Sequence, residues 1–390
     1  MPPLPRQGEH MVRYDDWVVK GIPYAIILIL AIVFLIVGNR IATEGMVVYD
    51  SDDAAPTYEA RILRLVDVTE HYTMFDEWQV FQFEAEIISR GERRGEMVTF
   101  TQSTRFLFER FNRIAEEGDR VMLALTAVGA WSFIDYVRIY NVAVLGLAFV
   151  ILLVVFGRFK GFNSVLSLGL TGLAVFAVFI PSVLSGMNIY ISSIVVCIYA
   201  IVTTLFIING VNKKSAAAVA GCLGGVLAAG VLTFFMSRTM ELTGITQSES
   251  RILLTLIPES PIDLNAIIFA GIIIGAVGAI MDIAVSISSA LWELKTQMPN
   301  ASFKDIFKSG INIGKDILGS NINTLVLAYI GSSLTVILFL LSHFNSVLRI
   351  LNRELVLVEL LQAIIGGFGI FLTMPLTALI CAVLYVRRPS

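Results

Sequence analysis

Long apolar runs alternate with short polar connections over most of this 390-residue chain. A helix needs about 20 consecutive apolar residues to cross the hydrocarbon core of a bilayer. Runs of roughly this length lie at residues 21–38, 139–157, 163–184, 189–209, 215–236, 264–291, 317–341 and 357–386. The pattern therefore predicts an α-helical polytopic membrane protein with eight transmembrane helices.

Between the first and second apolar runs the period changes to strand-like alternation. The alternating segments lie at residues 58–68, 78–88, 97–102, 118–125 and 131–140. Gly91, Gly95 and Gly118 mark turns between them, so we expect a small antiparallel barrel, either OB-like or SH3-like. Residues 106–117 predict a short helix. Such a barrel could dock a partner, gate the membrane domain or serve only as a structural module.

The distribution of Lys and Arg predicts the direction of each span, because these residues concentrate in cytoplasmic loops. They precede the first run and recur in every second connection, which places both termini in the cytoplasm. We therefore expect a cytoplasmic N-terminus with an uncleaved anchor helix at 1–38, an extracytoplasmic β domain at 39–138 and a seven-helix membrane domain at 139–390.

Two connections carry surface signals of their own. Residues 237–263 mix charges, apolar residues and prolines, which favours a short helix along the outer membrane surface. Residues 301–317 have an amphipathic pattern, and Ser302 with Asp305 forms a capping-box signal, so we expect a separate amphipathic helix on the cytoplasmic surface.

Composition supports a membrane protein and excludes several other classes. Apolar residues make up 56% of the chain and charged residues only 15%, with a formal net charge of -3. This balance argues against nucleic acid as a partner and leaves the lipid bilayer as the main environment. No Walker loop, nucleophile elbow or HExxH motif is present, so we expect no enzyme activity, no cofactor and no metal site.

The last three apolar runs each carry a stripe of small and polar residues at helical spacing. The stripes are Gly271, Gly275, Gly278, Asp282, Ser286, Ser289 and Glu293 in the sixth run; Asn321, Thr324, Ala328, Gly331 and Thr335 in the seventh; and Glu359, Gln362, Gly366, Gly369, Thr373 and Thr377 in the eighth. Small residues let helix backbones approach closely, and polar ones can hydrogen-bond across the contact. Tight packing, with each stripe facing protein rather than lipid, is the simplest interpretation.

Asp282 favours a functional interpretation of these stripes. A neutral Ser or Asn suffices for packing, whereas an ionised side chain at the bilayer centre costs about 2.5–3.5 kcal/mol on insertion scales. No basic residue lies inside another span to pair with it. We therefore consider two roles, a hydrogen-bonded structural acid or a proton relay formed by Asp282, Ser286, Ser289, Asn321, Asn323, Thr324 and Gln362. The helix-packing glycines would be Gly271, Gly275, Gly278, Gly331, Gly366 and Gly369.

Three stretches resemble the YibE/F family of bacterial membrane proteins. They read GAIMDIAVSISSALWE (278–293), FKSGINIGKDILGSNINTLVLAYIGSSL (307–334) and IIGGFGIFLTMPLTALI (364–380). The resemblance covers nearly the whole chain and implies an anchor helix, an external β domain and a helical membrane block in the bacterial inner membrane, that is, the plasma membrane.

The same region also resembles, more distantly, SecD/SecF-type and other RND-superfamily membrane units. There one span carries G-x-x-x-D, an amphipathic helix follows, and the next span opens with D-A-N-x-T-T. Gly278 and Asp282 match the first motif and Asn321 with Thr324 the last, whereas Gly319 stands where the second aspartate would be. This resemblance implies that spans three to eight are RND-like and work in pairs, as a homodimer or as a heterodimer with a sibling membrane protein.

These observations lead to two functional hypotheses. The first is a membrane transporter or permease, coupled to protons through Asp282. The second is a membrane assembly factor or sensor scaffold that transports nothing and whose external β domain binds a partner. A water-accessible cavity beside Asp282 would favour the first hypothesis, and dry packing the second.

Overall fold

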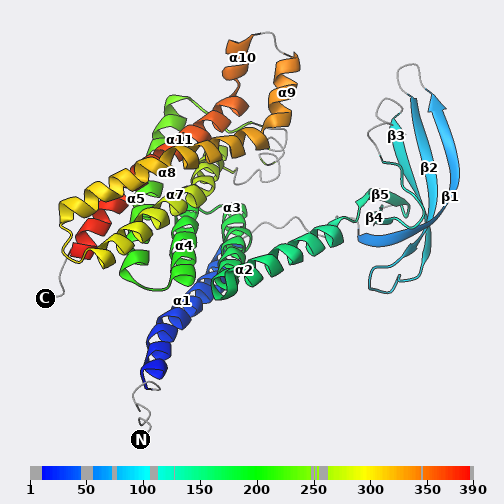
Figure 1. The fold of residues 1–390 in the computed structure, drawn as a ribbon. Coiled ribbons are helices and arrows are strands. Elements are labelled where there is room, and N and C mark those ends of the chain that lie inside the picture. The colour runs from blue at the N-terminus through cyan, green and yellow to red at the C-terminus, as the bar shows by residue number, and fades with distance from the viewer. Residues whose placement is uncertain are drawn as a thin grey trace, which may run out of the picture. The chain divides into compact units, whose positions relative to one another are not determined.

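The chain folds into two units, and the smaller one contains the alternating segment together with the first part of the second apolar run. The computed structural model describes residues 11–44, 56–72, 77–105, 113–126, 128–246, 250, 253, 262–343 and 346–386. One unit consists of residues 48–152, and the other of residues 1–47 together with residues 153–390. Figure 1 traces the helices and strands of both units along the chain.

Long apolar helices dominate the chain. The described helices are α1 (Met11–Thr43), α2 (Ile139–Ala174), the π-helix η2 (Val175–Phe179), α3 (Ile180–Leu184), α4 (Ile189–Asn209), α5 (Lys213–Thr239), α7 (Leu264–Gln297), α8 (Phe303–Ser332), α9 (Leu334–His343), α10 (Val347–Leu351) and α11 (Glu354–Val386). Among the described residues, six stretches are long and apolar enough to cross a membrane, or seven if the bent pair α8 and α9 forms one span. The structure thus confirms a helical protein with several candidate spans.

The longest candidate span contains a sharp break. Residues Ile139–Leu184 form a continuous apolar stretch of 46 residues. A straight helix of that length would measure about 69 Å, more than twice the hydrocarbon thickness of about 30 Å. Arg158 interrupts it with φ 49° and ψ -128°. Just beyond, Gly161 lies so close to the carbonyl of Leu153 that a Cβ on residue 161 would overlap it. The chain therefore turns sharply here.

The core of the larger unit is built around α7. This helix packs against α4, α5, α8 and α11, and its Ile280, Ile283 and Ile287 are fully buried. Next to it, α5 and α11 approach closely, because a Cβ on Gly225 would overlap the Thr373 hydroxyl. Close glycine-mediated contacts of this kind replace the hydrophobic driving force that lipid cannot provide.

The predicted surface helix at 301–317 and the predicted span at 317–341 are not separate elements. Instead, α8 runs without interruption from Phe303 to Ser332, and the capping box of Ser302 and Asp305 at its start is confirmed. No proline interrupts this stretch, and Gly310 and Gly314 fit against α11, so the helix continues. The break comes later, where α8 and α9 are bent by 60°.

A side chain from α1 replaces a hydrogen bond that a proline in α3 removes. Pro181 has no N–H, so it leaves the carbonyl of Ala177, four residues earlier, without its helical donor. The π-helix η2 lies directly before this point. Asn39 of α1 donates from Nδ2 to the Ala177 oxygen at 2.5 Å. This bond satisfies the freed carbonyl inside an apolar unit.

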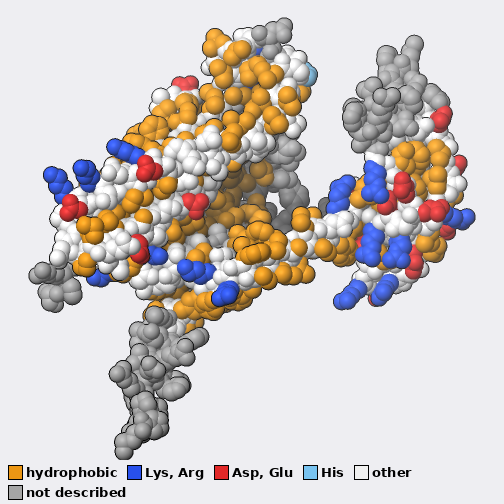
Figure 2. Space-filling view, in the orientation of Figure 1, with side chains coloured by type: hydrophobic (Ala, Val, Ile, Leu, Met, Phe, Trp, Pro, Cys, Tyr) orange, Lys and Arg blue, Asp and Glu red, His pale blue; other side chains and the backbone are white. Residues whose placement is uncertain are grey.

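The helix surfaces have the composition expected in a lipid environment. In Figure 2, hydrophobic side chains cover much of the visible face of the helices, and Lys side chains gather near the first turns of α8. Large apolar residues of α2 such as Leu145 and Phe156 are exposed. Outward-facing apolar surface of this extent is what a bilayer would cover.

The smaller unit contains the predicted barrel. Its strands are β1 (Thr57–Tyr72), β2 (Glu77–Ile87), β3 (Met97–Arg105), β4 (Arg120–Leu125) and β5 (Trp131–Tyr136). They close in the order β1-β2-β3-β5-β4, with β1 pairing β4 and with β3 parallel to β5. Phe83, Phe100 and Leu123 fill the interior. The closed five-stranded barrel is therefore confirmed, whereas the expectation of an antiparallel barrel is wrong for the pairing of β3 with β5.

Two further predictions concern segments that the structure describes only in part. Within the helix predicted at 106–117, residues 106–112 lie outside the described residues, and residues 113–116 are not helical. In the segment 237–263, where a surface helix was predicted, residues 247–249, 251–252 and 254–261 lie outside the described residues.

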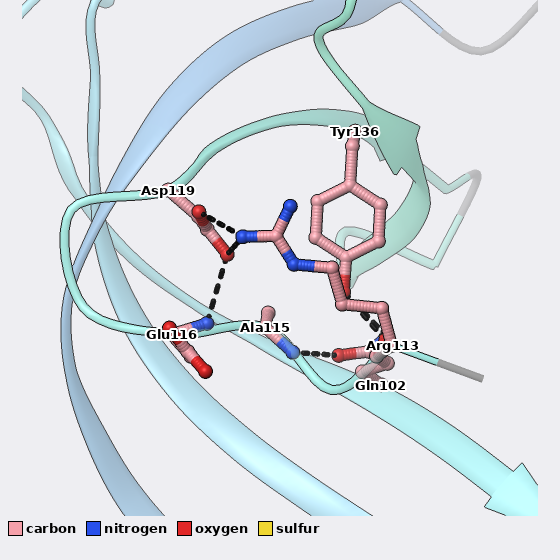
Figure 3. Close-up of polar contacts among 6 residues, drawn as sticks. All are labelled: Gln102, Arg113, Ala115, Glu116, Asp119 and Tyr136. Carbon is pink, nitrogen blue, oxygen red and sulfur yellow. Dashed lines mark hydrogen bonds and ion pairs between the residues drawn. The ribbon is translucent and has the colours of Figure 1, made fainter. Parts of the chain in front are cut away.

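A buried glutamine holds residues 113–116 against the barrel (Figure 3). Gln102 of β3 donates to the carbonyl of Arg113 at 3.0 Å and accepts from the N–H of Ala115 at 3.0 Å. The Tyr136 hydroxyl donates to the same Arg113 carbonyl at 2.6 Å. Arg113 in turn pairs with Asp119 through both carboxylate oxygens. The Gln102 amide and the Tyr136 hydroxyl thus supply hydrogen bonds that a helix or strand would otherwise provide.

Candidate functional site

The stripe on α7 keeps its helical alignment but faces out of the chain. We call the stripe Gly271, Gly275, Gly278, Asp282, Ser286 and Ser289 the polar face of α7. All of these residues are exposed except Ser289, which is half-buried. In the single chain most of this face is therefore not covered by another described helix, and the expectation that it faces protein stays a prediction. The opposite face carries the branched side chains that fill the core, whereas glycine and serine offer little apolar area to bury.

Asp282 lies near the middle of the 34-residue helix α7 and its side chain is exposed. Within the part of the chain that the structure describes, its carboxylate makes no ion pair or hydrogen bond. A helix surface this far from either end would meet lipid or another protein rather than water. The structure thus presents an unpartnered acid on an outward-facing surface.

Two contacts align α8 with α7. A Cβ on Gly275 would lie 2.8 Å from the Tyr329 hydroxyl, and one on Gly314 would lie 3.3 Å from Ile287. The helices therefore run antiparallel, and interpolation places Asn321 at about the level of Asp282. The predicted relay residues Asp282 and Asn321 thus lie at about the same height along the antiparallel pair of helices.

The predicted relay residues of α8 do not bond to Asp282. Asn321 is half-buried, and Thr324 is exposed and donates to the carbonyl of Ser320 at 2.9 Å in its own helix. Asn323 is exposed and, two residues from Asn321, points away from it by about 200° around the helix. Of these three residues, therefore, Asn321 alone is half-buried, and within the described residues none of them forms a hydrogen bond with Asp282.

Gln362 joins α11 to the same seam. Its side chain is half-buried, and its Nε2 donates to the carbonyl of Gly271 at 3.4 Å. A Cβ on Gly275 would lie 3.1 Å from this nitrogen. Gln362 and Gly275 therefore meet near one end of the polar face of α7, away from Asp282.

The predicted packing glycines divide into two groups. A Cβ would lie 2.6 Å from Leu325 on Gly366, 2.9 Å from Ile280 on Gly369 and 2.8 Å from the Tyr329 hydroxyl on Gly275, so these three glycines are needed for close packing. A Cβ on Gly271, Gly278 or Gly331 would meet nothing within 4 Å. These three leave open surface in the single chain.

Sequence reasoning missed Tyr329 as part of this seam. Its hydroxyl is buried and has no hydrogen-bond partner among the described residues. Tyr329 and Glu359 line a cavity of about 170 Å³ beside the bend between α8 and α9. The predicted stripe passes beside Tyr329, through its neighbour Ala328, but an aromatic residue in an apolar run gave no separate signal.

The chemistry of this arrangement is limited to acids, amides and hydroxyls. Among the described residues, no group of three or more His, Cys, Asp or Glu side chains is placed to hold a metal ion. A lone carboxylate with neighbouring amide and hydroxyl groups can take up and release a proton. The cavity next to Tyr329 does not include Asp282 in its lining.

Comparison with known proteins gives one match. The family model of the YibE/F-like protein matches residues 145–387, well over half of the chain and including all of α7, α8 and α11. No curated protein matches the chain. No solved structure matches it either. The more distant resemblance to SecD/SecF-type and RND units therefore stays a prediction.

Proposed function

Because the chain belongs to the YibE/F-like family, and the matched region holds the whole polar face of α7, we propose that it is a membrane transporter coupled to protons through Asp282. One observation supports this proposal above the others. A carboxylate lies near the middle of an apolar helix, and no described residue pairs with it. Side chains of this kind are rare in membranes because they are costly, and they mark proton and ion pathways.

The proposal includes a topology of eight spans in the plasma membrane. The turn at Arg158 divides residues 139–184 into two lengths that each suit one crossing. With α8 and α9 as one bent span, the total becomes eight. Lys213 and Lys304 then lie on the cytoplasmic side with both termini, and the OB-like barrel is extracytoplasmic.

We further propose that a second copy of the chain covers the polar face of α7. Exposure of Asp282 to lipid would be unfavourable, whereas a second helix could shelter it. Gly271 and Gly278 leave room for a neighbouring backbone to approach, as in other small-residue helix contacts. Closed symmetric dimers are the commonest assembly of identical chains. The proton site would then lie between two copies.

Replacement of the carboxylate tests the transport proposal. Purified protein in liposomes, with a pH-sensitive dye inside, should show proton flux that Asp282→Asn abolishes, because the amide cannot exchange protons at this position. Asp282→Glu should keep part of the flux. The matched control is Glu293→Gln, which neutralises an exposed acid near the end of the same helix and should leave the flux unchanged.

The scaffold hypothesis makes the opposite prediction. It draws support from the cavity beside Tyr329, whose lining excludes Asp282. Under this hypothesis the unmutated chain and the Asp282→Asn variant would both show the proton flux of protein-free liposomes. The variant would also be more stable, because a costly acid has been neutralised. That pair of results would exclude a proton-coupled transporter.

A further inference from the structure

A second polar site lies in the same unit, far along α7 from Asp282. The C-terminal end of α5 and the N-terminal ends of α4 and α7 surround a cavity of about 270 Å³, which we call the α4–α5–α7 pocket. Its polar lining residues are Tyr190, Ser237, Arg238, Glu241, Asp263 and Asn265. Pockets for drug-sized ligands measure about 300–1,000 Å³, so any ligand here is smaller.

Two buried atoms on the pocket wall lack partners. Ser237 Oγ and Asn265 Oδ1 are both shielded from solvent, and neither has a hydrogen-bond partner among the described residues. A buried polar atom without a partner costs about 1–3 kcal/mol. Both residues line the same cavity, so this wall contains polar groups that the described chain does not itself satisfy.

The charged residues on the wall are Arg238, Glu241 and Asp263, which are solvent-exposed and form no ion pair with a described residue. Arg238 lies over the Phe234 ring at 4.5 Å and makes no ion pair with a described acid. Asp263 caps α7 by accepting from the N–H of Ala266, and Glu241 makes no ion pair within the described part of the chain. The pocket therefore offers one strong donor group on α5 and several oxygen acceptors at the start of α7 and in the turn after α5.

The wall that carries Glu241 is fixed by a distant helix. Glu241 has φ 52°, a conformation that a residue with a Cβ adopts only when its surroundings hold it. The Glu354 carboxylate of α11 accepts from the N–H groups of Thr243 and Gly244 and from the Thr243 hydroxyl. Leu242, between Glu241 and Thr243, is buried. The turn is thus held in place without any contribution from an occupant of the pocket.

We propose that the α4–α5–α7 pocket binds a small zwitterion, with its anionic group at Arg238 and its ammonium group at Asp263, Glu241 and Asn265. An ammonium group has only donors, which suits carboxylate and amide oxygens, and a guanidinium suits carboxylate or phosphate. Two sources offer this chemistry, a free amino acid and the phosphoethanolamine headgroup of a lipid. This site is independent of proton transfer at Asp282.

The first arm of the test measures free ligands on the purified full chain in detergent. L-Alanine should bind, whereas acetate and methylammonium, which each carry only one of its two charged groups, should bind at least tenfold more weakly. Arg238→Gln and Asp263→Asn should each weaken L-alanine binding tenfold or more, and asparagine keeps the helix cap. Lys213→Gln, at the other end of α5, should bind as the native chain does.

The second arm measures lipid, by mass spectrometry of phosphatidylethanolamine retained through purification from a mixture with phosphatidylcholine. Selective retention that Arg238→Gln and Asp263→Asn abolish, without L-alanine binding, would assign the pocket to the lipid headgroup. The proposal is overturned if neither probe binds, if the two variants behave as the native chain does, or if acetate or methylammonium binds as tightly as L-alanine.

Discussion

At the residue scale, the bond from Asn39 to Ala177 links α1 to the helix that contains Pro181. Replacement by Leu would leave the Ala177 carbonyl without a donor, so we expect Asn39→Leu to lower the free energy of unfolding by about 1–3 kcal/mol. Thermal unfolding in detergent measures this change. In the background of Pro181→Ala, which restores an N–H four residues after Ala177, the same substitution should cost less. Equal costs in both backgrounds would contradict the assignment.

Helical spacing identified the members of the polar face of α7 but not its orientation. Periodicity shows which residues share a side, whereas the direction of that side depends on which neighbour offers complementary area. Ile280 is buried against Gly369 of α11 and Ile287 against Gly314 of α8, so they turn inward and Asp282 turns outward. The sequence alone could not decide between these directions, because either side of α7 could have faced a partner helix.

At the element scale, the contact between α5 and α11 depends on glycine. We expect Gly225→Ala to lower the free energy of unfolding by about 1–3 kcal/mol, since the new methyl group overlaps Thr373. Gly172→Ala in α2 is the matched control, because a Cβ there meets nothing within 4 Å. Alanine should stabilise that helix by about 0.5–1 kcal/mol. Thermal unfolding of both variants in detergent gives the comparison, and equal shifts would contradict the packing argument.

The barrel provides a second prediction at this scale. Gln102→Leu removes the amide that holds residues 113–116 in Figure 3. Under native conditions, we expect trypsin to cleave this variant after Arg113 at least several times faster than the unmutated chain, because the segment loses its anchor. The control is Thr101→Val, at the exposed neighbouring position of β3, which trypsin should cleave at the same rate as the unmutated chain. Cleavage rates are measured by mass spectrometry of the released fragments.

Elements differed in how well their sequence revealed them. The strands were predictable because their alternation matches a barrel with one buried face, as Phe81, Phe83 and Ala85 show. The extent of α8 was not, because the amphipathic segment and the apolar segment differ in character while no residue between them ends a helix. The bend at its far end has no proline to announce it.

At the scale of the whole molecule, the proposed second copy predicts cross-links across the polar face of α7. Gly278→Cys and Ser286→Cys should form disulfide-linked dimers when membranes are oxidised, because both positions would face the other copy. Val231→Cys on α5 is 57% exposed and should remain monomeric. The native cysteines are buried and give a low background. Monomers throughout would remove the proposed dimer, whereas dimers from Val231→Cys would show random collision.

The α4–α5–α7 pocket shows what sequence reasoning could not reach at this scale. Its polar groups come from the ends of three helices that are separated by long stretches of chain. Each alone looks like an ordinary helix boundary, where Asp263 caps α7 and Arg238 sits near the end of α5. Only the packing of the helices brings these groups around a common space.

The Glu354 carboxylate also has a consequence for biogenesis. Thr243 and Gly244 leave the ribosome well before their partner, which follows 111 residues after Thr243. Domains and helices begin to assemble during synthesis, from the N-terminal end onward. The turn after α5 must therefore wait, without its anchor, until translation has reached the last helix. A nascent chain stalled before residue 354 would display this turn in its unanchored form.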